Sequence, residues 1–232
     1  MAASLLLVSC RRADYGSTLR QPERTDVVFI GTLHGRHLRS ENYPLSDISA
    51  HLRRVEPSVV FVQIPPFLLD DVVADPDHPW RTVLPEVTEV IRYAEETDTP
   101  LRGISGFNSN VAAAWQEYAL RYPDGPNDAG YRRARDYWIR RSAREGGTDI
   151  QWLSSPLYER LAEWTDRARD RALRDDPARP DWTGHGATFR RAVESCPGER
   201  IAVVYDARRI WLLAAELESM DAVRVDLRAF LP

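Results

Sequence analysis

His34 is the residue of this sequence whose position best suits chemistry. It belongs to residues 27–37, where four consecutive apolar residues predict a short buried strand that Gly31 and Thr32 end. Gly35 breaks the chain again, so we expect the imidazole on a tight turn at the carboxyl end of the strand, where open α/β sheets bind ligands. A histidine there can move a proton or ligate a metal, or it can simply hydrogen-bond neighbouring loops.

Other polar residues are expected close to this histidine. His37 follows it by three positions and could join it in a two-histidine metal site, with Glu41 or Asp206 supplying a carboxylate. Gln63 ends a second predicted strand, which places it at the same edge of the sheet. Its amide could orient a ligand there, or it could hydrogen-bond only the backbone.

Asp206 and Arg209 lie three residues apart, where a late strand is predicted to turn into a helix. Opposite charges at this spacing can form an ion pair across one helical turn. The same two residues could instead hold an anionic ligand at the start of the helix, where backbone N–H groups are free. The sequence leaves both arrangements open.

Strand and helix patterns alternate along the chain and predict an α/β fold. A helix at 45–55 between strands at 27–30 and 58–64 forms a βαβ unit, whose two strands are expected to be parallel neighbours. The further predicted strands are 100–104, 200–205 and 222–227. The further predicted helices are 83–94, 108–121, 129–144, 155–174, 185–196 and 210–217.

We therefore expect one domain over residues 25–232, with a central and mostly parallel sheet built from βαβ units at both ends of the chain. A long helical insertion at about 107–196 separates these units and is expected to cover the ligand edge of the sheet. The block could be a cap over that edge or a layer packed on one face.

Composition narrows the chemistry that the chain can perform. All 31 basic residues are arginine, which excludes a lysine Schiff base, a lysine general base and the lysine of a phosphate-binding loop. The net charge of −4 gives no electrostatic reason to expect a nucleic acid partner. The Gly-x-Ser-x-Gly motif of common α/β serine hydrolases is missing from the sequence.

The first residues resemble a lipoprotein signal. Residues 7–10, Leu-Val-Ser-Cys, have the form of a lipobox, which would make Cys10 an acylation site and residues 1–24 a signal with a polar tether. The apolar run is short, however, and no basic residue precedes it. Two localisations therefore remain open, a lipid-anchored protein of the cell envelope and a cytoplasmic protein. Membrane contact is expected only through such an anchor.

The motifs at the two ends of the domain resemble the TraB/GumN group. That group belongs to a superfamily with the TIKI metalloproteases, the ChaN haem-binding lipoproteins and the erythromycin esterases. Its members open with a Gly-Thr-x-His turn, follow with a Pro-Asp-x-Val-x-x-Glu strand, and end with a strand, a Gly-Ala-x-His turn and a helix. Here residues 31–34, 57–64 and 203–210 occupy these places.

The departures from the family pattern weigh against its chemistry. Gln63 replaces the glutamate, Arg209 replaces the second histidine, and Asp206 replaces the glycine of the second turn, so only His34 is retained. A glutamine cannot act as a general base, and a charged arginine cannot ligate a metal.

The resemblance therefore implies a degenerate relative, non-catalytic or weakly active, that keeps a ligand pocket around His34. The other pocket residues would be His37, Gln63, Asp206 and Arg209. We expect Gln63 and Arg209 to converge on His34, and the charge of Arg209 to lower the pKa of His34. The pocket is expected to bind a small anion, a carboxylate or a peptide without any cofactor. The alternative is a metal-dependent hydrolase of peptides or esters, with His34 as catalytic residue and metal ligand.

Overall fold

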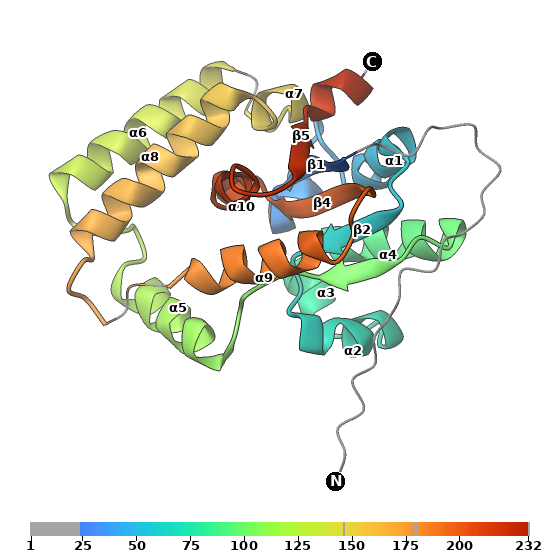
Figure 1. Cartoon of the computed structure of the whole chain (residues 1–232). Helices are drawn as coiled ribbons and strands as arrows, with labels where there is room; N and C mark the ends of the chain where they lie inside the picture. Colours follow the sequence, from blue (N-terminus) through green and yellow to red (C-terminus); the bar gives the residue numbers. More distant parts are fainter. Residues whose placement is uncertain (1–23, 146, 178, 180, 232) are drawn as a thin grey trace, which may run out of the picture.

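The computed structural model describes residues 24–145, 147–177, 179 and 181–231 (Figure 1). Its centre is a sheet of five parallel strands in the order β3-β2-β4-β1-β5. The strands are β1 (Thr25–Thr32), β2 (Val59–Val62), β3 (Leu101–Gly103), β4 (Arg200–Asp206) and β5 (Ala222–Val225). The expected α/β fold with a parallel sheet is confirmed.

One expectation about strand order is wrong. β1 and β2 are not neighbours, because β4, from late in the chain, pairs with both of them. β4 is apolar and buried along almost its whole length, which suits a central strand with both faces covered. Because β4 pairs with β1, Asp206 lies opposite Thr32 at the carboxyl edge of the sheet.

Side chains alternate between the two faces of the sheet, and each face has its own apolar core. Val28 and Ile30 of β1 point into the larger core, together with residues of α1 (Ser46–Val55) and α4 (Glu86–Thr97). Val27 and Phe29 point the other way, into a core with α9 (Thr183–Glu194) and α10 (Ile210–Leu217). Helices thus cover both faces of the sheet (Figure 1).

Short elements connect the strands to these helices. Along the chain they are η1 (His34–Arg39), η2 (Pro66–Leu68), α2 (Leu69–Ala74), α3 (Pro79–Val83), η3 (Ala207–Arg209) and η4 (Leu227–Phe230). η1 and η3 directly follow β1 and β4, so both lie at the carboxyl edge of the sheet.

The middle of the chain is helical, as expected, and it does more than cap one edge. Its helices are α5 (Ser109–Arg121), α6 (Ala129–Arg144), α7 (Ile150–Leu153), α8 (Pro156–Ala172) and α9. α8 lies against η3 and α10 at the carboxyl edge, whereas α9 forms a layer on one face. α8 begins as predicted, with the Ser155 hydroxyl accepting a hydrogen bond from the Tyr158 amide. Among the described residues, no helix has the length and apolar character needed to cross a membrane.

Candidate functional site

The site is built where the turn after β4 packs on the end of β1. A side chain at Gly31 would place its Cβ 2.8 Å from the Cβ of Ala207, so only a glycine allows η3 to approach this closely. In the turn after β1, His34 has a backbone φ of 53°, in the left-handed region. This backbone conformation is unfavourable for a residue with a side chain.

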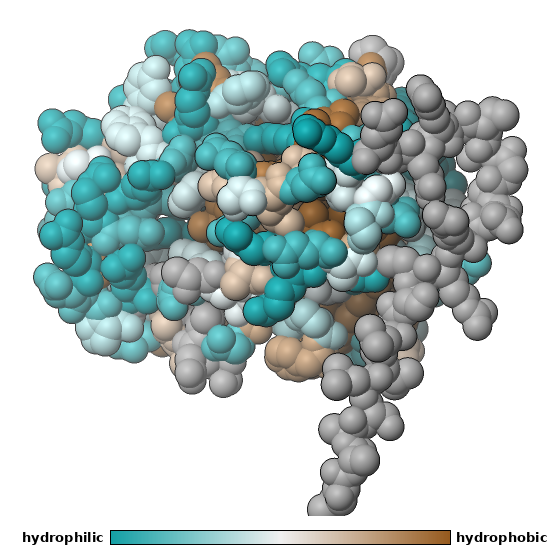
Figure 2. Space-filling view, in the orientation of Figure 1, coloured by the Kyte–Doolittle hydropathy of each residue, from teal (hydrophilic) through white to brown (hydrophobic). Residues whose placement is uncertain are grey.

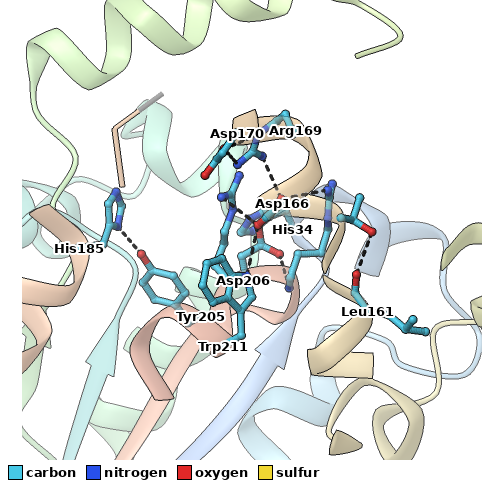
Figure 3. Close-up of polar contacts among 12 residues, drawn as sticks. His34, Leu161, Asp166, Arg169, Asp170, His185, Tyr205, Asp206 and Trp211 are labelled. Atoms are coloured by element: carbon cyan, nitrogen blue, oxygen red, sulfur yellow. Dashed lines mark hydrogen bonds and ion pairs between the residues drawn. The ribbon is translucent and has the colours of Figure 1, made fainter. Parts of the chain in front are cut away.

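His34 lies between two carboxylates. Its Nδ1 is 2.6 Å from Oε1 of Glu86, and its Nε2 is 3.7 Å from Oδ2 of Asp206. Figure 3 shows His34 and Asp206 facing each other at the sheet edge. Burial alone would lower the pKa of His34, but the two carboxylates, Asp206 facing Nε2 and Glu86 hydrogen-bonded to Nδ1, raise it to about 10. His34 is therefore an imidazolium at neutral pH, with a carboxylate at each ring nitrogen.

This arrangement corrects the expectation for the pKa of His34. We expected Arg209 to lower it, but the two carboxylates outweigh any effect of the arginines and raise it. Asp206 was one of the candidate carboxylate partners. Glu86 was not identified as one, and Glu41 does not contact His34 among the described residues.

Glu86 reaches His34 from the first turn of α4. The residue is only 2% exposed, and its Oε2 has no hydrogen-bond partner among the described residues. A buried carboxylate with so few partners is costly unless a cation faces it, and His34 supplies that cation. A glutamate at a helix start is common, so the sequence held no signal that this one faces a histidine 52 residues away.

Asp206 contacts residues of η1, of η3 and of the segment after β2. Its side chain faces His34 and accepts a hydrogen bond from the backbone N–H of Arg208, and its own N–H donates to Oε1 of Gln63 over 2.7 Å. Burial would raise the pKa of Asp206, but the facing imidazolium of His34 and the charges of Arg208 and Arg209 hold it well below its usual range. Gln63 thus positions the Asp206 backbone and reaches His34 only through it.

Arg209 is turned toward α8. Its guanidinium is buried, lies 3.2 Å from Asp166 and stacks over the ring of Trp182 at 3.7 Å from the centroid. Asp166 also faces Arg169 at 3.0 Å (Figure 3). An ion pair between Asp206 and Arg209 does not form in the described part of the chain. Asp166 lies among other charged residues of α8, and nothing in the sequence marks it as the buried partner of Arg209.

His37 is buried and hydrogen-bonds the backbone on both sides of the turn after β1. Its Nε2 accepts the N–H of Leu33 at 2.9 Å, and its Nδ1 donates to the carbonyl of Tyr43 at 2.9 Å. One nitrogen accepts and the other donates, so the ring is neutral, and burial lowers the pKa of His37. Both nitrogens are engaged by the backbone, and His37 does not pair with His34 in a two-histidine site.

The donor set does not fit the metal that the family resemblance allows. The described residues contain no cluster of three or more His, Cys, Asp and Glu side chains arranged to hold an ion. Each ring nitrogen of His34, the expected ligand, faces a carboxylate, so a metal ion would have to displace the proton that these carboxylates hold on the imidazole.

Two cavities of the described residues lie away from His34. One of about 390 Å³ lies between α2, α4 and β3, and one of about 250 Å³ lies beside β5 and the start of α8. Neither of these two cavities is lined by His34, Glu86 or Asp206.

Comparisons of this chain with family models, with curated proteins and with solved structures find no match.

Proposed function

We propose that this domain binds a small anion, most favourably an organic carboxylate, at the carboxyl edge of its sheet, and that it is a non-catalytic, divergent relative of the TraB/GumN group. The single observation that carries the proposal is the position of His34 between Glu86 and Asp206. A protonated imidazole with both nitrogens facing carboxylates cannot accept a proton or ligate a metal. It is a fixed cation that holds two loops together.

Two arginines next to this cation are available to a ligand. Arg36 lies two residues after His34 in η1, is exposed, and has no side-chain partner among the described residues. Arg208 lies in η3, half-exposed, above the ring of Trp138, and its guanidinium is 3.9 Å from Oδ1 of Asp166. Burial raises the pKa of Tyr158, and the positive charges of Arg36 and Arg208 oppose that rise. Both arginines therefore act on the same buried tyrosine. Guanidinium groups bind carboxylate and phosphate oxygens in a planar, bidentate geometry.

Apolar side chains at the same edge favour an organic anion over an inorganic one. Leu38 of η1 is 68% exposed, and Val83 of α3, which packs against η1, is 64% exposed. The hydrocarbon part of a carboxylate could cover such side chains while its charged group meets the arginines.

Thermal unfolding with added ligands tests this proposal. Succinate is expected to raise the Tm of the wild-type protein more than phosphate does, and the rise is expected to disappear in Arg36→Gln and in Arg208→Gln. Arg39→Gln is the matched control, because Arg39 is an exposed arginine of the same short helix. An equal rise in Arg36→Gln and wild type would contradict the proposal, as would stabilisation by zinc or manganese alone.

A second function is favoured by the unequal distances around His34. Glu86 is within hydrogen-bonding distance of Nδ1, whereas Asp206 is 3.7 Å from Nε2, so a movement of Asp206 would leave a carboxylate–imidazole dyad with Nε2 facing a substrate. Such an enzyme would hydrolyse an ester or peptide by general base catalysis. Its rate would follow the deprotonation of His34 and rise toward pH 10, and His34→Gln would abolish it.

A further inference from the structure

Two helices of the chain carry the same exposed pattern of residues. In each helix, an arginine at position i is followed by an aromatic residue at i+4 and by arginines at i+7 and i+11. This spacing places all four side chains on one face of the helix. The members are Arg133, Tyr137, Arg140 and Arg144 in α6, and Arg160, Trp164, Arg167 and Arg171 in α8. All eight residues are exposed.

The two patterns form one surface, because α6 and α8 pack side by side in opposite directions (Figure 1). Ala134 packs with Ala168, and the rings of Tyr137 and Trp164 meet edge to face at 77°, with 6.0 Å between their centroids. The aromatic pair therefore lies at the centre, with arginines of both helices on each side of it. We call these eight residues the arginine–aromatic face.

The charge of this face is not balanced locally. α6 and α8 together contain ten arginines and five carboxylates, in a chain whose net charge is −4. Of the six arginines of the face, only Arg167 has an ion-pair partner among the described residues, Glu163 at 2.6 Å. Figure 2 shows hydrophilic residues gathered over α6 and α8, at the left of the view.

Aromatic side chains are exposed within this charged region. Tyr137 is 47% exposed and Trp164 is 42% exposed. Tyrosine and tryptophan have an apolar ring and a polar tip, which suits the boundary between water and hydrocarbon. Guanidinium groups beside them would meet phosphate and carboxylate groups of lipids.

We propose that the arginine–aromatic face binds the surface of an anionic lipid bilayer. Two antiparallel helices present a flat surface, and the stretch from Arg133 to Arg144 spans about 16 Å along α6. A single-stranded nucleic acid is favoured less, because Tyr137 and Trp164 pack against each other edge to face and leave less ring surface for bases to stack on.

This surface is independent of the anion site and of acylation at Cys10, which lies outside the described residues. One lipid chain gives only weak membrane binding, and a basic surface is the usual second contribution. A protein with both would remain at the membrane without a spanning helix.

Co-sedimentation of the full chain with vesicles tests the proposal, with Cys10→Ala in every protein so that acylation plays no part. Binding is expected to phosphatidylcholine vesicles that contain phosphatidylserine, to weaken as salt is added, and to be absent with phosphatidylcholine alone. Arg133→Gln with Arg140→Gln is expected to reduce the partition coefficient about tenfold or more. The control pair, Arg39→Gln with Arg54→Gln, removes the same charge from exposed arginines elsewhere and is expected to change it by less than about threefold.

A second variant tests the aromatic pair. Trp164→Gln is expected to weaken binding to the mixed vesicles, and circular dichroism checks that the exposed positions tolerate these changes. Equal binding by the face pair and the control pair would overturn the proposal. Tighter binding of single-stranded oligonucleotides than of the mixed vesicles at the same salt would also overturn it and would assign the face to nucleic acid.

Discussion

His34 and Glu86, 52 residues apart in the chain, meet through Nδ1 and Oε1 at 2.6 Å. The contact joins the turn after β1 to the first turn of α4. Glu86 is almost completely buried, with its side chain 3% exposed, while His34 is 30% exposed. Replacing His34 would leave Glu86 buried without a counter-charge, whereas replacing Glu86 would leave His34 facing Asp206 alone.

The first prediction concerns the titration of His34. Its ring C–H resonances in NMR spectra are expected to stay constant between about pH 5 and about pH 8, because the pKa is raised to about 10. His34→Gln identifies these resonances by their loss. Glu86→Gln removes one of the two carboxylates that face His34, so the midpoint of the His34 titration is expected to move to lower pH. A midpoint near the ordinary value of 6.5 in the wild type would contradict the assignment of His34 as a cation.

The second prediction follows for stability. A pKa of about 10 in the folded protein against 6.5 in the unfolded chain stabilises the fold fully below pH 6.5, and this contribution is lost as pH rises through about 10. The free energy of unfolding is expected to fall over this interval by up to about 1.4 kcal/mol per pH unit.

Urea unfolding measures this at a series of pH values up to about 9.5, below the ionisation of exposed tyrosines. His34→Gln serves as the control, because it lacks the titrating group and is expected to show a much flatter profile. Identical profiles for the two proteins would show that His34 gains no proton affinity on folding.

The strands and helices could be predicted because their periodicity is local. α6 (Ala129–Arg144) begins and ends at the predicted residues, since the apolar spacing is clear and Asp128 caps the helix. The place of β4 between β1 and β2 could not be predicted in the same way. It depends on pairing between strands far apart in the sequence, which a local pattern does not encode.

The site was predicted only in part, for a similar reason. The turn motif identified His34 and the strand ends identified Gln63 and Asp206, because the carboxyl ends of parallel strands share one edge. Glu86 and Asp166 lie on helices, where a carboxylate that faces inward resembles any solvated one. Only the structure shows that Glu86 faces His34 and that Asp166 faces Arg209.

The third prediction concerns the buried carboxylate of Asp166, which is 1% exposed. It faces Arg169 at 3.0 Å and Arg209 at 3.2 Å, and it accepts a hydrogen bond from the indole of Trp211 at 3.3 Å. Asp166→Asn keeps the shape and removes the charge, which leaves Arg209 buried without a counter-charge. We expect a loss of roughly 3–5 kcal/mol in the free energy of unfolding, measured with denaturant.

Asp170→Asn is the matched control for this change. Asp170 also faces Arg169, at 2.8 Å, but its side chain is 29% exposed and solvent replaces part of the contact. The expected loss is about 1 kcal/mol or less. Losses of similar size at Asp166 and Asp170 would show that burial does not distinguish the two carboxylates.

The fourth prediction tests the contact that brings η3 onto β1. Gly31→Ala is expected to cost about 1–3 kcal/mol, because the new Cβ would lie 2.8 Å from the Cβ of Ala207 and the surrounding sheet leaves little room to move. Gly35→Ala is the control, since no atom lies within 4 Å of a Cβ at that position, and it is expected to be neutral or slightly stabilising.

A double-mutant cycle separates the steric contact from other effects of the alanine. Ala207→Gly removes the atom that Gly31→Ala would meet and leaves the Cα of residue 207 at 3.3 Å, a distance that small shifts can relieve. The double variant is therefore expected to lose less stability than the two single changes added together, by at least about 1 kcal/mol. If the losses of stability are simply additive, there is no steric contact between a side chain at position 31 and Ala207. The steric reason given for glycine at position 31 would then be wrong.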